Sequence, residues 1–404
     1  MAKKHQNTIY LDHASATPID SSVAKLISLY ERRYFANASS IHKGGVETQK
    51  VIENAREQIA KLIFAHSDEI IFTGSGTESD ALAIIGVVRG YKGKNIPHII
   101  TTTIEHSAVL ENCRMLEKNR EAEVTYIMPD ADGIINPKDV RDALKVSTAL
   151  VSVMYANNEI GTVQPIQEIA KIIRHYRKNT NSSFPLLHTD ACQAMNYLPT
   201  ENIEKLGVDL LTFNSSKIYG PKGVGVLYKK RGVNLAPIYL GGGQEFGLRS
   251  GTENIAGIAG VALALSQTFR IKKKESTRLI KLRDYGIKKL LSLSHVSGYE
   301  IILNGDKVKR LPNNINISIS GISSELLVIE LDAKGIQVSA KSACKSEELD
   351  ESYVIGALRK AQNIKPNTTD GSLRISLGRQ TKKGDIDALF KALKEILAKY
   401  RKWK

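Results

Sequence analysis

Three short stretches of this chain carry side chains that could do chemistry, and each follows an apolar run. In NSSKIYGPKG, residues 214–223, three hydrogen-bonding side chains precede Lys217, whose amine could act as a nucleophile or a base. Asp190 ends the run FPLLHTD, where a carboxylate is costly unless something pairs with it. In TGSGTESD, residues 73–80, two glycines allow a tight turn into a helix, and a helix N-terminus suits phosphate. Each feature alone also has an ordinary explanation: a solvated lysine, a helix cap and a capped turn.

Together, the three features match the needs of one cofactor. Pyridoxal phosphate requires an anion site for its phosphate, a lysine that forms a Schiff base with its aldehyde, and an acid that keeps its ring nitrogen protonated. A parallel sheet would bring all three to one edge, and the 27 residues from Asp190 to Lys217 fit the step from one strand end to another. The sequence therefore predicts a pyridoxal phosphate site.

The elements that must position these residues follow an alternating pattern from about residue 46 to residue 230. Helical spacing of apolar residues over 48–63 is followed by a short apolar run, and this alternation continues along the chain. The runs expected as strands are EIIFTG, HIITTT, VTYIMP, ALVSVMYA, FPLLHTDA, VDLLTFNS and GVGVLYKK. Such alternation predicts an α/β fold with a mostly parallel sheet covered by helices, and with ligands bound beyond the carboxyl ends of the strands.

The order of expected helices and strands changes after Gly251. A long helix is expected over 253–292 and a last amphipathic helix over 383–399. The runs EIILNG, NINISIS, ELLVIELDAKGIQVSA and LRISLG are expected as strands between them. A chain of 404 residues is long for one core, so this α+β part is expected to form a smaller second domain.

Composition and charge narrow the possible classes of protein. The net charge of +15 admits acidic partners, but the basic residues are scattered, and neither zinc-finger spacing nor an aromatic RNA-binding signature is present. A solubilising surface is therefore favoured over direct nucleic-acid binding. No apolar run reaches 18 residues and the N-terminus does not read as a secretory signal, so no membrane association is expected. Three scattered cysteines with no Cys-x-x-Cys indicate neither disulfides nor a metal site, and favour the cytoplasm.

The order of motifs along the chain resembles the cysteine desulfurases of the class V aminotransferase family, which supply iron–sulfur cluster assembly and tRNA thiolation. The motifs that carry this resemblance are YLDHASATP, FTGSGTESDALAI, IEHSAVLENCR, NNEIGTVQPI, HTDACQA, SKIYGPKGVGVLY, GGGQEFGLRSGTEN, SACKSEELDESYV and SLRISLGR. They cover essentially the whole chain. The resemblance implies fold type I of the pyridoxal phosphate enzymes, in which a large domain holds a mostly parallel seven-stranded sheet flanked by helices. The large domain is expected at 16–262, and a smaller α+β domain at 1–15 and 263–404.

The resemblance also implies roles for the residues around the cofactor ring. Lys217 is expected to form the Schiff base, and Asp190 to partner the pyridinium nitrogen. Gln193 would donate a hydrogen bond to the phenolic oxygen, Asn158 would contact the cofactor or the substrate, and His106 would stack on the ring. Without the resemblance, the better interpretation of His106 would be an ordinary loop histidine whose hydrogen bonds are satisfied locally.

Other roles concern the phosphate and the substrate carboxylate. Gly76 and Thr77 would bind the phosphate, and Thr252 would reach the phosphate across the interface of a homodimer. Arg374 would grip the carboxylate of L-cysteine, a task that suits a forked guanidinium.

Cys344 matches the cysteine that forms a persulfide in this family. It lies in the small, polar run AKSACKSEELDES, which is typical of an exposed loop, expected at about 339–352. The flanking Lys341 and Lys345 should favour the reactive thiolate. Cys113 and Cys192, in contrast, are expected only to fill space.

One position departs from the family pattern. The family typically has Ser-x-His-Lys, whereas this chain has Asn214 at the first of these positions and Ser216 in place of a histidine that helps to bind phosphate. An amide and a hydroxyl can still donate hydrogen bonds, so both residues are expected to contact the cofactor.

The resulting prediction is a cysteine desulfurase that converts L-cysteine to L-alanine and passes the sulfur on as a persulfide of Cys344. Sulfur acceptors would be protein cysteines, on an iron–sulfur scaffold or a tRNA-thiolating enzyme. The alternatives are a selenocysteine lyase or another pyridoxal phosphate lyase, and a non-catalytic sulfur-transfer scaffold. A nucleic-acid-binding protein ranks last.

Overall fold

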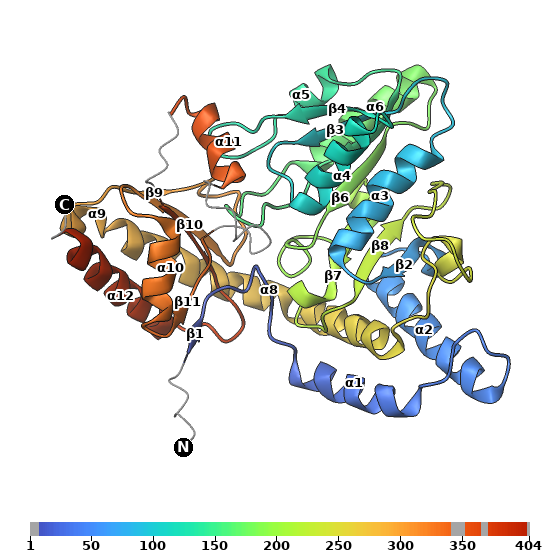
Figure 1. The fold of residues 1–404 in the computed structure, drawn as a ribbon, viewed down its shortest axis with the longest axis horizontal. Coiled ribbons are helices and arrows are strands. Elements are labelled where there is room, and N and C mark those ends of the chain that lie inside the picture. The colour runs from blue at the N-terminus through green and yellow to red at the C-terminus, as the bar shows by residue number, and fades with distance from the viewer. Residues whose placement is uncertain (1–7, 341–351, 365–370, 402–404) are drawn as a thin grey trace.

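The larger part of the protein is built on a seven-stranded sheet (Figure 1). The computed structural model describes residues 8–340, 352–364 and 371–401. The strands of the sheet are β2 (Ile70–Thr73), β3 (His98–Thr102), β4 (Glu123–Ile127), β5 (Thr148–Ser152), β6 (Leu186–Asp190), β7 (Leu210–Asn214) and β8 (Gly225–Lys229). They lie in the order β2-β8-β7-β6-β5-β3-β4, and β8 is antiparallel to both of its neighbours while the other pairs are parallel. The predicted α/β fold with a mostly parallel seven-stranded sheet is confirmed.

Helices cover both faces of this sheet, because successive side chains of a strand point to opposite faces. Ile71 of β2 packs in one core cluster with α3 (Gly76–Gly90) and α4 (Ser107–Lys118). Its neighbours Ile70 and Phe72 pack in another cluster with α2 (Lys43–Leu62), α6 (Ile166–Thr180) and the first half of α8 (Ile255–Leu291). The remaining helices of this part are α1 (Ser21–Arg33), α5 (Pro137–Asp142) and α7 (Ile203–Leu206).

The strand ends bring the residues of interest to one edge of the sheet. β6 ends at Asp190 and the neighbouring parallel strand β7 ends at Asn214, three residues before Lys217. β2 leads through Gly74 into α3, whose first turn is capped by the Ser75 hydroxyl accepting the Glu78 N–H at 3.1 Å. The order of strands thus places the acid, the amine and a helix N-terminus on the same side.

The smaller part has its own sheets and its own core cluster. Its strands are β1 (Ile9–Tyr10), β9 (Ile301–Leu303), β10 (Asn314–Ile319), β11 (Ile336–Gln337) and β12 (Gly371–Ser376), and its helices are α9 (Ser294–Ser297), α10 (Ser324–Asp332) and α12 (Lys383–Arg401). The helix α11 (Tyr353–Ala361) instead packs against Ile104 and Ile160 of the larger part. β12, β10 and β9 form an antiparallel sheet, and β1 pairs in parallel with β11. Leu11 and residues of β10, β12 and α12 share one apolar cluster.

The expectation of a strand over ELLVIELDAKGIQVSA is wrong for its first half, which forms α10. Ser323 caps this helix by accepting the Leu326 N–H at 3.3 Å, and Leu327 and Leu331, one turn apart, point into the core. Only Ile336–Gln337 is a strand.

One long helix joins the two core clusters. α8 has 37 residues; Ile258 and Leu265 belong to the cluster under the large sheet, whereas Leu279 and Leu290 belong to the cluster of the smaller part. Figure 1 shows α8 running from one part into the other. The division into domains at 1–15, 16–262 and 263–404 stays a prediction, for which this change of cluster along α8 is the supporting observation.

Across the described ranges, no helix combines the length and the apolar character that a membrane span requires.

Candidate functional site

A cavity of about 150 Å³ lies at the edge of the sheet where β6 and β7 end. Nine of the twelve residues singled out by the sequence line it: Gly76, Thr77, His106, Asn158, Asp190, Gln193, Asn214, Lys217 and Arg374. Ser216 and Thr252 do not line it, and Cys344 lies outside the described residues.

Lys217 reaches the cavity from a short 3-10 turn, Ser215–Lys217, directly after β7. Its amine is half-buried and donates a hydrogen bond to the carbonyl oxygen of Ser15, and its own carbonyl accepts one from the Asn196 side chain. The turn needs a glycine at position 220, because a Cβ there would lie 2.1 Å from the Ser215 hydroxyl oxygen. The amine is therefore held in place by the surrounding chain, unlike an ordinary surface lysine.

Two carboxyl groups share this cavity. Asp190 is 7% exposed, and its Oδ1 accepts the backbone N–H of Cys192 at 2.8 Å. Asp80, one turn into α3, was not anticipated from the sequence; burial, and next the charge of Asp190, raise the pKa of its carboxyl well above the usual range. Asp80 therefore favours its neutral form. An acid in the apolar helix that follows TGSGTES was the signal that could have revealed it.

The first turn of α3, which also lines the cavity, suits an anion. Gly76 and Thr77 form the first turn of α3, where free backbone N–H groups and the helix dipole favour negative charge. A Cβ on Gly76 would lie 2.9 Å from Nδ2 of Asn214, so only glycine allows this close approach. The Ser216 hydroxyl donates to Oδ1 of Asn214 at 3.2 Å, so its contact is with Asn214 and not with the cavity.

His106 lies at the start of α4 with a defined ring orientation. Its Nδ1 accepts the backbone N–H of Ala108 at 3.1 Å, which places the proton of the neutral ring on Nε2. Burial is the main cause that lowers the pKa of His106, and the positive charges of Lys217 and Arg374 lower it further against the opposing effect of Asp190. The ring is therefore kept neutral.

The residue before it, Glu105, is a fully buried acid. Its Oε1 accepts hydrogen bonds from the Met154 N–H and the Thr102 hydroxyl, both at 2.9 Å, while Oε2 has no partner. Burial raises the pKa of Glu105 to about 8.

This pKa predicts a pH-dependent effect of the substitution Glu105→Gln on stability. Between the ordinary pKa of 4.5 and about 8 the folded protein retains a proton that the unfolded chain releases, so this group lowers stability as the pH rises. Glutamine does not ionise, and we expect Glu105→Gln to be more stable than the native protein by on the order of 4 kcal/mol at pH 8.5, which is the free energy that this rise in pKa represents. Denaturant unfolding at pH 4.5 and pH 8.5 measures this difference, which should be small at the lower pH. The same substitution at the exposed Glu168 should show no such trend.

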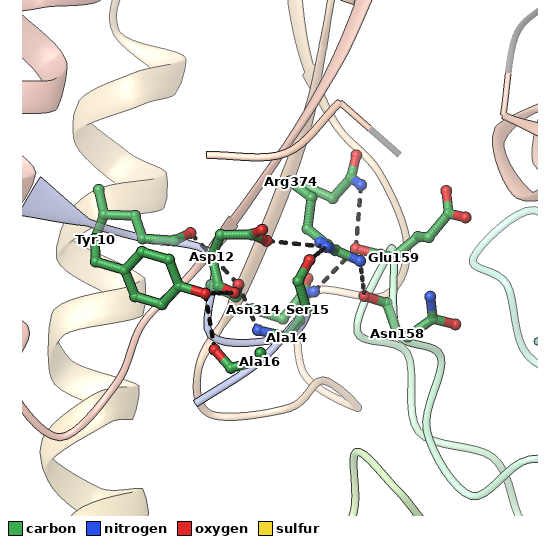
Figure 2. A network of polar contacts seen from close by, with 12 residues as sticks. Tyr10, Asp12, Ala14, Ser15, Ala16, Asn158, Glu159, Asn314 and Arg374 are labelled. Atoms are coloured by element: carbon green, nitrogen blue, oxygen red, sulfur yellow. Dashed lines mark hydrogen bonds and ion pairs between the residues drawn. The ribbon is translucent and has the colours of Figure 1, made fainter. Parts of the chain in front are cut away.

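Arg374, on β12, is the largest fully buried side chain of the described part of the chain and closes the cavity from the side of the smaller part. Its Nη2 donates to Oδ1 of Asp12 at 2.9 Å and to Oγ of Ser15 at 2.5 Å (Figure 2). Its Nη1 donates to the carbonyl oxygen of Asn158 at 3.2 Å, and its Nε has no hydrogen-bond partner. Oδ1 of Asn158 is likewise buried and unpartnered.

Gln193 and Cys192 follow Asp190 in the chain. Nε2 of Gln193 donates to the carbonyl oxygen of Ala14 at 2.9 Å, which ties the N-terminal segment to the cavity wall. Cys192 is buried, as expected, but it also lines the cavity, and burial followed by the charge of Asp190 raises the pKa of its thiol. Its thiol therefore stays protonated beside the carboxylate.

With this geometry in view, comparison with known proteins identifies the family. Residues 9–389 match the family model described as Aminotransferase class-V. The chain belongs to the class V aminotransferase family. It is 43% identical to the cysteine desulfurase IscS of Dictyoglomus turgidum over 97% of this chain and 95% of that protein, and 40% identical to the cysteine desulfurase IscS 1 of Archaeoglobus fulgidus over 97% of each. A solved structure titled NifS-like protein superposes with a TM-score of 0.86 at 32% identity, covering 97% of this chain and 99% of that chain.

Class V aminotransferases use pyridoxal phosphate, and the cavity fits this cofactor. It contains an anion site at the N-terminus of α3, a carboxylate at Asp190 and an amine at Lys217, which are the three groups that the cofactor requires. Oδ1 of Asn158 and Nε of Arg374 are buried and have no hydrogen-bond partner in the protein, so both can bind a ligand. Within the described residues, no cluster of three or more histidine, cysteine or acidic side chains could hold a metal ion.

Thr252 is exposed and lines a separate hollow of about 60 Å³. The sequence predicts that this residue acts across a dimer interface. Gly74 and Arg249 line the same hollow. The carboxylate of Glu78 links these two residues, because it accepts hydrogen bonds from the Gly74 N–H at 2.7 Å and from Nε of Arg249 at 2.8 Å. Thr252 thus lies next to the loop that leads into α3, but outside the cavity of its own chain.

Proposed function

We propose that this class V aminotransferase is a pyridoxal-phosphate-dependent cysteine desulfurase, which converts L-cysteine to L-alanine and transfers the sulfur to Cys344 as a persulfide. The observation that carries the proposal is the convergence of Lys217, Asp190, the N-terminus of α3 and Arg374 on one cavity. The names of the relatives of this chain agree with the reaction.

In this reaction, the bound cofactor supplies an electron sink for the α-carbon of the substrate. Arg374 binds the substrate carboxylate, and Asn158 fills the space beside it. Lys217 removes the α-proton and returns a proton later, as a general acid–base catalyst. Asp190 supplies the negative charge at the ring nitrogen. Neutral His106, with its proton on Nε2, faces the same cavity and handles the proton of the substrate thiol.

The sulfur transfer uses Cys344. Its thiolate attacks the substrate sulfur; a sulfur–sulfur bond forms while the carbon–sulfur bond breaks, and the electron pair of that bond returns to carbon, where a proton completes L-alanine. We propose that the persulfide is then passed to cysteines of acceptor proteins in the cytoplasm, such as an iron–sulfur scaffold or a tRNA-thiolating enzyme.

Mass spectrometry tests the proposed function directly. After the purified protein is loaded with pyridoxal phosphate and treated with L-cysteine, the peptide containing Cys344 should gain one sulfur atom, and L-alanine should accumulate. A protein that stays colourless after incubation with the cofactor would support a non-catalytic scaffold instead. Turnover of selenocysteine but not of L-cysteine would indicate a selenocysteine lyase.

We further propose that the enzyme is a homodimer in which the loop 239–252 contacts the second copy. This loop exposes three large apolar side chains, Tyr239, Leu240 and Phe246. Exposed apolar groups that gather on one loop usually mark an interface. Its backbone is held in a costly conformation, with φ of +47° at Glu245 and +59° at Phe246. A buried ion pair of 2.8 Å between Arg56 and Glu245 stabilises it.

Leu240→Asp should therefore weaken self-association by about tenfold or more, because Leu240 is 86% exposed and a charge in an apolar interface is costly. Sedimentation velocity at several concentrations measures this change. Val308→Asp is the matched control, since Val308 is equally exposed at 85% but lies in the smaller part. If Thr252 completes the phosphate site of the second copy, Leu240→Asp should also release the cofactor on dilution.

A further inference from the structure

The sequence that contains Cys344 lies between two described residues, Ala340 and Ser352, and separate contacts hold its two ends. On the N-terminal side, Ser339 exchanges two backbone hydrogen bonds with Arg374 of β12, at 2.7 and 3.1 Å, so this end belongs to the smaller part. On the C-terminal side, Ser352 begins α11, which packs against the larger part. The contacts of Ser352 therefore decide how the second end is held.

A carboxyl group of the larger part binds Ser352 directly. The Ser352 hydroxyl donates to Oε2 of Glu159 at 2.5 Å, and both residues are buried, with exposed fractions of 7% and 1%. The hydroxyl oxygen also accepts the backbone N–H groups of Val354 and Ile355, at 3.2 and 3.3 Å, and so caps α11. Loss of the Glu159 side chain would remove the acceptor of a buried hydroxyl at the start of this helix, which is costly.

Glu159 is itself held by the surrounding backbone and side chains. Its backbone N–H donates to Oδ1 of Asn157 at 2.8 Å. Its carbonyl oxygen accepts Nδ2 of Asn314 at 2.9 Å and Nδ2 of Asn316 at 3.1 Å, both from β10 (Figure 2). The preceding residue, Asn158, lines the cavity. Glu159 therefore links the start of α11 to the wall of the cavity.

Other contacts hold the rest of α11. The Tyr353 hydroxyl donates to the carbonyl oxygen of Glu105 at 2.6 Å, and apolar residues of the helix pack against Ile104 and Ile160. Because these contacts do not involve Glu159, removal of its side chain should loosen the first turn of α11 and leave the helix docked. The expected effect on sulfur transfer is therefore a partial loss.

The position of Cys344 in the chain connects Glu159 to sulfur transfer. Cys344 lies only eight positions before Ser352. Holding both ends of a chain segment restricts the volume that its side chains can visit, and so raises their effective concentration near the fixed ends. We propose that Glu159 is a positioning residue, which holds Ser352 and thereby keeps the Cys344 thiol at a high effective concentration beside the cavity. This inference rests on the proposed function, because that function assigns the persulfide to Cys344.

The test compares two reactions of the cofactor-loaded protein, of which only one needs Cys344. Exchange of the α-proton of L-alanine in D2O uses Lys217 but no thiol, whereas persulfide formation from L-cysteine uses both. At saturating substrate, Glu159→Ala should slow persulfide formation at least about tenfold and change the exchange rate less than about threefold. Glu159→Gln keeps an oxygen that accepts the Ser352 hydroxyl, and should restore persulfide formation to within about threefold of the native rate. Nuclear magnetic resonance measures the exchange, and mass spectrometry of quenched samples measures the persulfide.

Hydrogen exchange gives a readout that needs neither cofactor nor substrate. In the cofactor-free Glu159→Ala protein, amides of the first turn of α11 should exchange at least about tenfold faster than in the native protein, because this turn opens locally. Amides of α12 should exchange at the native rate, and Glu159→Gln should behave as the native protein in both helices.

Asp387→Ala is the matched control. Asp387 also accepts a hydroxyl hydrogen bond of 2.5 Å, from Tyr285, and this bond joins α12 to α8. It does not line the cavity and is remote in the chain from both ends of the sequence around Cys344. This variant should leave both reactions unchanged.

Three outcomes would overturn the role of Glu159. These are persulfide formation at the native rate in Glu159→Ala, an equal loss of both reactions, and a failure of Glu159→Gln to restore the persulfide. If Glu159→Ala does not fold, Ser352→Ala and Ser352→Thr make the same comparison from the other side of the bond, because threonine keeps the hydroxyl and the cap. A native protein that forms no persulfide contradicts the proposed function, and this role with it. A native protein that forms one, together with any of the three outcomes, contradicts only this inference.

Discussion

Replacement of Lys217 by alanine is expected to lower the rate of L-alanine formation from L-cysteine by at least about 10³-fold. The substitution removes the one amine that lines the cavity among the described residues, and with it the group that moves the α-proton. The protein should still fold, since the side chain is half-buried and contributes to none of the apolar clusters. Amino-acid analysis of the reaction mixture measures the rate.

A second measurement on the same variant separates chemistry from folding. Reduction of the loaded native protein with borohydride should fix the cofactor to the peptide that contains Lys217, and mass spectrometry should find no such adduct in Lys217→Ala. Lys222→Ala is the matched control, because Lys222 lies in the same loop but is exposed and does not line the cavity. An adduct on Lys222 in the native protein would contradict the assignment of Lys217.

Replacement of Cys344 by alanine should abolish the persulfide and reduce sulfur transfer to a thiol acceptor by at least about 10²-fold. Cofactor loading should be unaffected, because the anion site, the acid and the amine all come from the larger part of the chain. The persulfide is lost because the substrate sulfur must be attacked by a nucleophile, and the methyl side chain of alanine is not a nucleophile. Mass spectrometry of the protein after treatment with L-cysteine checks the result.

Cys113→Ala provides the control for this experiment. Cys113 is fully buried in the cluster that packs α4 on the sheet, and burial raises the pKa of its thiol far above the range in which a thiolate forms. It should keep native sulfur transfer with a modest loss of stability. Sulfide release at the full native rate in Cys344→Ala would remove the basis for the persulfide relay.

The large sheet could be predicted because its signal is local. Each strand is a short apolar run bounded by turn residues, and Asp190 and Lys217 stand out because each follows such a run. The run ELLVIELD was harder, since a short apolar stretch fits a strand or a buried helix equally well by periodicity. Only the cap at Ser323 and the packing of Leu327 and Leu331 decide for a helix.

The contacts that could not be predicted are those between residues far apart in the chain. Asp12 and Arg374 are 362 positions apart, and Ser15 and Lys217 are 202 positions apart, so no spacing rule connects them. Asp80 was missed for a related reason: its importance comes from Asp190, on a different element. The resemblance to a family supplied the roles of His106 and Arg374, which the residue pattern alone left open.

The continuity of α8 has a consequence for how the protein unfolds. A helix of 37 residues spans about 55 Å, and its two halves complete two separate apolar cores. Neither core can lose its segment of the helix without fraying the segment that the other core requires, so the two should melt in a single cooperative transition. Calorimetry should then give one heat-absorption peak, and two resolved peaks would contradict this coupling.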